Sequence, residues 1–300
     1  MDNKKWYQIK EQAAGEKRLI LTWYVYKILG RTGLDIITFF VSLSVFIFSK
    51  NIRLYSKKYL TAVGRYSDIK PTLINQFRHI LSYASTLADK IEVFSGNYNA
   101  DNIKFNSSQD KSELVQDIEA GNGIFFLCNH LGNIEVLRSF LINSNKNSSK
   151  ELNIFMSKTQ SQIFNSFIRK ISKEEYLNIY TIEDIGIDTS IRLKDSLNRG
   201  GFVFIAGDRT SDNEKSSTFS TDFLGKKMTF PVGSFKLAQL MQVPIYFITA
   251  IKQNNKNYTI HIQKHVFSTL ENIEKDYVNY LEKLVIQNPL EFYHFYDFLN

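Results

Sequence analysis

From residue 110 onward, short apolar runs alternate with segments whose apolar residues recur at helical spacing. Two of the runs, GIFFLC at 123–128 and GFVFIA at 201–206, are too short for helices and lack charge. This alternation predicts an α/β fold, with a central, mainly parallel sheet flanked by helices. The predicted strands are 123–128, 152–156, 177–181, 201–206, 244–252 and 257–264. The predicted helices are 71–95, 110–120, 134–141, 160–171, 188–198 (capped by Asp188), 234–241 and 271–287.

The first 70 residues differ from the remainder in charge. They hold 13 Lys and Arg against 5 Asp and Glu, a net of +8, whereas residues 71–300 have a net of −1. We therefore divide the chain into a basic segment, 1–70, and an α/β domain, 71–300. A concentrated positive charge predicts an acidic partner, such as an anionic membrane surface, a nucleic acid or an acidic protein.

The same basic segment carries the longest apolar run, 36–48, which contains no charged residue. Its length as a helix falls short of a bilayer core, and Gly30 and Gly33 can interrupt the helix before it. We expect N-terminal membrane-associated helices embedded shallowly, with the basic residues at anionic headgroups. The alternative is a buried core helix. Nucleic acid is not expected, because no DNA- or RNA-binding motif appears.

Polar clusters follow two of the predicted strands, where ligands of parallel sheets bind. The first cluster, after 123–128, contains His130 and, five residues later, Glu135. A carboxylate in the next helical turn can fix the tautomer of a histidine, so we expect His130 to be a general base oriented by Glu135. The second cluster contains Asp208, Arg209 and Thr210, of which the arginine suits a phosphate or carboxylate. The alternatives are that His130 is a structural residue at a strand end and that Arg209 is a solvated loop arginine.

Other catalytic templates are missing from the sequence. It contains no G-x-S-x-G, H-E-x-x-H, Walker A or G-x-G-x-x-G motif. The single cysteine, Cys128, excludes an internal disulfide and a multi-cysteine metal site, and we expect no metal. Cys128 fits a small buried apolar residue better than a nucleophile. The polar stretch 208–222 is predicted to lie outside the core.

Taken together, these segments resemble the lysophospholipid acyltransferase superfamily, and within it the bacterial lipid A biosynthesis acyltransferase branch. The H-x4-D/E motif of that family corresponds to NHLGNIE, with His130 and Glu135. Its second block resembles residues 154–170, which include Lys158, and its third resembles GDRTS at 207–211. The run from FLGKK through FPVGS to PIYFITA resembles the branch's F-x-G, F-P-x-G and proline-containing blocks.

The resemblance implies transfer of a fatty acyl chain from an acyl carrier protein or coenzyme A thioester to a hydroxyl of a lipid or glycolipid. It implies that no cofactor is bound beyond this donor, and a location on the cytoplasmic face of the bacterial inner membrane. His130 and Glu135 would be catalytic. The substrate-binding residues would be Asn129, Gly132, Asn133, Lys158, Asp208, Arg209, Thr210, Phe230, Pro231 and Gly233.

Two alternatives remain open at this point. A lipid esterase or thioesterase would use the same dyad with water, and a non-enzymatic basic protein would bind membranes or nucleic acid. The acceptor also stays open among a lipid A precursor, another glycolipid, a glycerophospholipid and an amino-acid-derived lipid.

Overall fold

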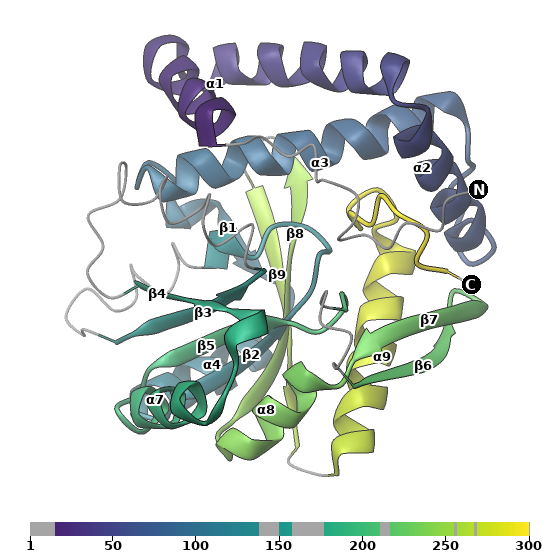
Figure 1. Cartoon of the computed structure of the whole chain (residues 1–300). Helices are drawn as coiled ribbons and strands as arrows, with labels where there is room; N and C mark the ends of the chain where they lie inside the picture. Colours follow the sequence, from purple (N-terminus) through teal and green to yellow (C-terminus); the bar gives the residue numbers. More distant parts are fainter. Residues whose placement is uncertain are drawn as a thin grey trace.

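A computed structural model describes residues 16–137, 150–157, 177–210, 217–254, 257–266 and 269–299. Its centre is a seven-stranded sheet with the order β1-β9-β8-β2-β5-β3-β4 (Figure 1). Neighbouring strands from β8 to β4 run parallel, whereas β9 is antiparallel to β8 and carries β1 parallel to itself. The prediction of a mainly parallel sheet flanked by helices is confirmed. The strands are β1 (Ile103–Phe105), β2 (Ile124–Cys128), β3 (Leu152–Met156), β4 (Leu177–Thr181), β5 (Phe202–Ala206), β8 (Ile245–Asn254) and β9 (Asn257–His265).

The two faces of the sheet bury alternate residues of the same strands, as the period of two requires. In β2, Phe125 and Leu127 join one buried cluster, and Phe126 and Cys128 join the other. The larger cluster is covered by α2 (Lys50–Val63), α7, α8 and α9, and the smaller one by α4 and the end of α3 (Leu73–Phe94). Because both faces are covered, β2 is buried along its whole length. The helices are α4 (Ser108–Glu119), α7 (Ile187–Asn198), α8 (Gly233–Met241) and α9 (Leu270–Gln287).

Several details differ from the predictions. Part of the polar stretch 208–222 forms β6 (Thr218–Phe223), which makes a hairpin with β7 (Lys226–Pro231). A charge-rich hairpin can form at the surface because only alternate residues turn inward. Asp208, at the start of this stretch, is completely buried. Helix α7 is capped by the backbone of Gly186, and Asp188 lies in its first turn. The predicted helix 160–171 falls outside the described residues, as does 138–141.

Three helices precede the sheet: α1 (Glu16–Phe48), α2 (Lys50–Val63) and α3 (Leu73–Phe94). Gly30 has φ 65° and ψ −164°, and this non-helical conformation bends α1 into two limbs. The bend agrees with the interruption that the sequence predicts at this glycine. The second limb lies along α3 (Figure 1). Helix α2 packs into the larger cluster through Tyr59, Leu60 and Val63, so part of the basic segment belongs to the main core.

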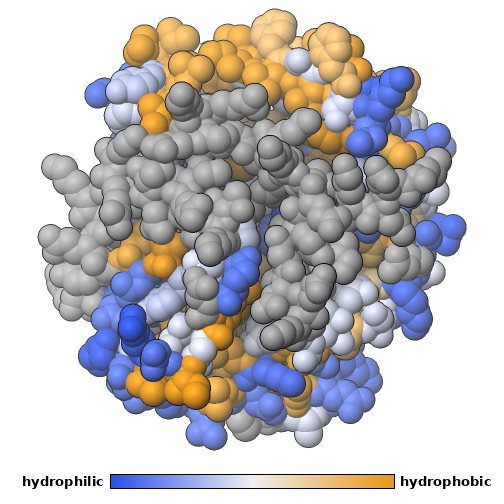
Figure 2. Space-filling model, in the orientation of Figure 1, coloured by the Kyte–Doolittle hydropathy of each residue, from blue (hydrophilic) through white to orange (hydrophobic). Residues whose placement is uncertain are grey.

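The outward face of α1 is apolar. Ile28 is 76% exposed and Phe48 82% exposed, and the orange surface over α1 in Figure 2 follows these and similar side chains. Among the described residues, one helical stretch, 20–48, is long and apolar enough to cross a membrane. In its most apolar 18-residue part, 17% of the residues are buried. An apolar surface this extensive is typical of a contact with a lipid or another protein.

Candidate active site

Strands β2 and β5 bring the two polar clusters together. They are adjacent and parallel, and their last residues, Cys128 and Ala206, lie side by side. His130 and Asp208 each follow two residues later, so both lie at the carboxyl edge of the sheet. The sequence expectation that this edge gathers the polar residues is consistent with the fold.

His130 and Asp208 form a hydrogen-bonded pair. The His130 Nδ1 atom lies 2.8 Å from Oδ1 of Asp208, and the His130 backbone N–H donates to Oδ2 at 2.8 Å. The Asp208 side chain is buried, whereas the His130 side chain is 31% exposed. An ionised carboxylate can only accept, so Nδ1 carries the proton and Nε2 carries the lone pair.

A second histidine contacts the same carboxylate. His294 Nε2 lies 2.9 Å from Asp208 Oδ2, and its Nδ1 lies 2.8 Å from the hydroxyl of Tyr296. With Asp208 ionised, the direction of donation runs from the Tyr296 hydroxyl to Nδ1 of His294, and from Nε2–H of His294 to Asp208. Asp208 thus accepts three hydrogen bonds, from two rings and one backbone amide.

These contacts set the protonation of the site. Burial and the nearby Arg209 guanidinium lower the pKa of His130, although Asp208 opposes them. Burial lowers the pKa of His294 to about 3, against the opposing effect of Asp208. Burial by itself would raise the pKa of Asp208, but the hydrogen bonds and charge interactions with both histidines hold it well below its ordinary value. At neutral pH the site therefore holds one carboxylate between two neutral imidazoles.

Glu135 is not the carboxylate that contacts His130. Its Oε1 pairs with Lys90 of α3 at 2.7 Å, and Oε2 is buried without a hydrogen bond to the described residues. The reason is the path of the chain after His130. Gly132 adopts φ 71° and bridges to Ala250, which directs the helical turn of Glu135 toward α3. The expected His–Glu dyad is corrected to a His130–Asp208 pair.

The neighbours of His130 position the backbone. The Asn129 amide donates to Oγ1 of Thr249 at 2.7 Å, and its oxygen accepts the Leu131 N–H at 3.1 Å. Gly132 is required because a Cβ atom there would lie 1.9 Å from the carbonyl oxygen of Ala250. Asn133 is fully buried and its N–H donates to the same carbonyl. These three residues build the turn that carries His130, and their expected contact with substrate stays a prediction.

Arg209 lies between the site and the segment 291–299. Its guanidinium donates to the Tyr293 carbonyl at 2.6 Å and lies 5.9 Å from the ring centre of Tyr296. It therefore holds the segment that delivers His294, while its charge acts on His130. Thr210, the last described residue of the range 177–210, is half-buried.

The remaining predicted residues lie elsewhere. Phe230 is completely buried and stacks on Phe219 with ring centres 5.5 Å apart, so it is core. Pro231 pairs with Thr218 in the β6–β7 hairpin. Gly233 is exposed at the start of α8. Lys158 falls outside the described residues.

The sequence reasoning missed His294 and Tyr296. Both come from the aromatic run FYHFYDF at 292–298, which pairs with the residue after His130 through a bridge between Leu131 and Phe292. No spacing rule links positions 130, 208 and 294. The available signal was a histidine within an aromatic run that matched no predicted helix or strand.

Two other chemistries can be tested against this geometry. The ligand atoms of His130, Asp208 and His294 lie within 4.8 Å of one another, so these three residues could hold a metal ion. Direct hydrogen bonds, however, already account for their arrangement. Burial raises the pKa of the Cys128 thiol well above its ordinary value, with Glu135 and Asp208 adding to this effect, so Cys128 is a protonated core residue.

Comparison with known proteins adds no identification. No family model matches this chain, and no curated protein matches it.

Proposed function

We propose that this protein is a membrane-associated O-acyltransferase that moves a fatty acyl chain from an acyl thioester to a hydroxyl of a lipid. The observation that carries the proposal is the His130–Asp208 pair at the carboxyl edge of the sheet, with the lone pair of Nε2 on the partly exposed side chain. The family resemblance of the sequence supports the same reaction. A neutral histidine with a depressed pKa is suited to take a proton from a hydroxyl at neutral pH.

In the proposed reaction, His130 Nε2 removes the proton of the acceptor hydroxyl as its oxygen attacks the thioester carbonyl. The new C–O bond forms, and the carbonyl electron pair moves to oxygen to give a tetrahedral oxyanion. When the oxyanion collapses, the C–S bond breaks and the thiolate takes the proton from Nε2–H. Asp208 stabilises the imidazolium that exists between these two transfers, and it keeps the ring in the productive tautomer. Arg209 supplies positive charge nearby.

The apolar face of α1 supports a membrane location. Exposed side chains of both limbs lie on the outside of the molecule, while the second limb packs on α3 (Figures 1 and 2). We propose that α1 lies in the membrane surface with this face in the acyl region. The donor would be an acyl carrier protein or coenzyme A thioester, which places the reaction on the cytoplasmic face of the bacterial inner membrane.

The test is incubation of the full chain with labelled acyl carrier protein or acyl-coenzyme A and total membrane lipid, followed by mass spectrometry. We expect an acylated lipid that is lost in His130→Ala and retained in His261→Ala, a matched histidine on β9. Free fatty acid without acylated lipid would instead identify a hydrolase that uses the same base with water. Acylated lipid at wild-type yield from His130→Ala would refute the mechanism.

A further inference from the structure

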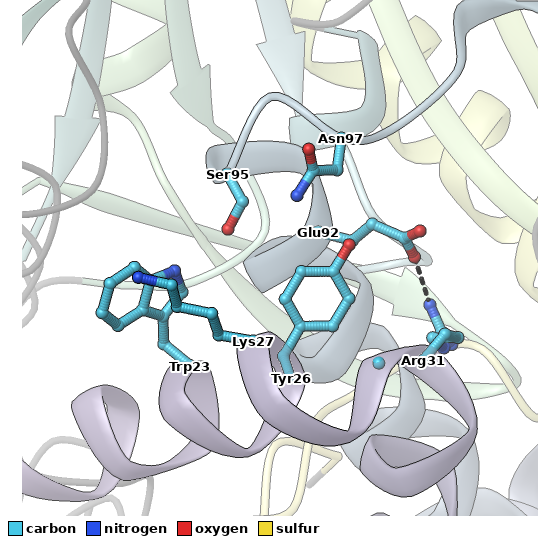
Figure 3. A pocket seen from close by; sticks show the side chains of 8 residues that line it. Trp23, Tyr26, Lys27, Arg31, Glu92, Ser95 and Asn97 are labelled. Atoms are coloured by element: carbon cyan, nitrogen blue, oxygen red, sulfur yellow. Dashed lines mark hydrogen bonds and ion pairs between the residues drawn. The ribbon is translucent and has the colours of Figure 1, made fainter.

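A hollow lies between the first limb of α1 and the end of α3. Its volume is about 460 Å³. Figure 3 shows Trp23, Tyr26 and Lys27 of α1 on one side of it, with Glu92 and Asn97 on the other. This hollow is separate from the residues around His130.

The bend at Gly30 explains the hollow. Trp23, Tyr26 and Lys27 recur at helical spacing on the face of α1 that is turned toward α3. The second limb closes on α3, where Arg31 pairs with Glu92 at 2.9 Å and also with Asp89. Before the bend, the first limb runs in a different direction from the second, and its side chains face the end of α3 across the hollow (Figures 1 and 3).

The lining is suited to a cation on one side and an anion on the other. The carboxylate of Glu92, the carbonyl end of α3 and the faces of Trp23 and Tyr26 all attract an ammonium group. Lys27 is exposed, and its Nζ lies 5.3 Å from the ring centre of Trp23. An ammonium there can bind a phosphate. The Asn97 side chain adds hydrogen-bond donors directed into the hollow.

The charges of this region balance. Among the described residues, Lys27, Arg31 and Glu92 line the hollow, and three further charged residues lie behind it, paired with Arg31 or with each other. Of the three cations in this group, Arg31 and Lys252 are paired with carboxylates. The cations are Lys27, Arg31 and Lys252, and the carboxylates are Asp35, Asp89 and Glu92. A ligand with a single charge would leave this balance uneven, whereas one with both charges would preserve it.

The opposite face of the same limb carries exposed apolar side chains. Leu21 is 64% exposed, and Tyr24 and Ile28 are also exposed. Because a helix is about 10–12 Å across, the chains of a lipid whose headgroup occupied the hollow can pass around the limb to this apolar face. From these observations we propose that the hollow binds the headgroup of a zwitterionic glycerophospholipid, with its ammonium toward Glu92 and the aromatic rings and its phosphate on Lys27.

The test uses Trp23 as the reporter. The chain has two tryptophans, so Trp6→Phe leaves the fluorescence of Trp23 alone. Glycerophosphoethanolamine is titrated into this full-length variant, and we expect a saturable change with a dissociation constant of about 1 mM, as befits a small headgroup. Lysophosphatidylethanolamine, below its micelle concentration, should bind at least about tenfold more tightly, because its chain adds apolar contact.

Two variants and two partial ligands make the result decisive. Lys27→Gln should weaken both titrations about tenfold, whereas Lys57→Gln, an exposed lysine of α2, should leave them unchanged. Glycerol 3-phosphate or ethanolamine binding as tightly as the complete headgroup would overturn the zwitterion assignment. Equal affinity for the headgroup and the lysolipid would overturn the assignment to a lipid and leave a free solute. A failure to bind would overturn this inference but not the proposed acyl transfer, which is measured separately.

Discussion

Replacing Asp208 by asparagine tests the proposed chemistry most directly. Asp208 accepts hydrogen bonds from both histidine rings and from the His130 backbone. An asparagine presents one oxygen and one NH₂ group, so at least one of these donors faces another donor. In the serine-protease triad, the equivalent change of aspartate to asparagine lowers kcat by about 10⁴ through the wrong histidine tautomer. We expect a loss of about 10³–10⁴ here, or about 4–5.5 kcal/mol of transition-state stabilisation.

The matched comparison is Glu135→Gln, which removes the other candidate carboxylate. Glu135 pairs with Lys90 and not with His130, so we expect kcat to change less than about threefold. Both variants are assayed by initial rates of acyl transfer, and thermal unfolding confirms that each is folded. A Glu135→Gln rate as low as that of a folded Asp208→Asn would refute the reasoning, because it would return the orienting role to Glu135.

Three further predictions concern protonation, backbone and reactivity. Because the pKa of His294 is about 3 in the folded state and near its ordinary value when unfolded, the unfolded state binds more protons between these values. As the pH drops through this range, His294 should therefore lower the free energy of unfolding by up to about 1.4 kcal/mol per pH unit. Urea denaturation at several pH values measures this slope, which should be smaller in His294→Asn. Gly132→Ala should cost more than about 2 kcal/mol in the same assay because of its clash with Ala250, against about 1 kcal/mol for Gly96→Ala, which has φ 70° but open space. Cys128→Ala should keep the acyl-transfer rate within about threefold, and rapid labelling of the native thiol by a disulfide reagent would contradict its assignment to the core.

The sequence predicted the fold more fully than the site. Buried strands such as β2 and β5 have no charges and adjoin helical repeats, so composition and period located them. The hairpin of β6 and β7 escaped this reasoning because its outward residues are polar and its inward ones are few. Local sequence patterns are therefore sufficient to locate a strand when both of its faces are buried, because burial then restricts its residues to apolar types.

The site was predicted in part for a related reason. That His130 and Asp208 both lie at the carboxyl edge of the sheet can be inferred from the alternation of elements. That β2 and β5 are neighbours cannot be inferred in this way, because β3 and β4 come between them in the sequence. The choice of Glu135 as the orienting residue rested on its spacing from His130 and on the resemblance to an H-x4-D/E motif, and the turn at Gly132 directs that side chain away. His294 depends on pairing between segments more than 160 residues apart, and a single sequence contains no local signal for that pairing.

The segment that follows α9 has a consequence for how the molecule is made. During synthesis, residues 130 and 208 leave the ribosome well before 291–299, which supply His294, the bridge to Leu131 and the carbonyl held by Arg209. Until that segment docks, Asp208 is a carboxylate at a sheet edge that lacks one of its ring partners. The sheet, with His130 and Asp208 at its edge, can therefore form first, and the contact of the His294 ring with Asp208 is made last. Such late closure through distant residues favours slow completion of the candidate site relative to the formation of the sheet.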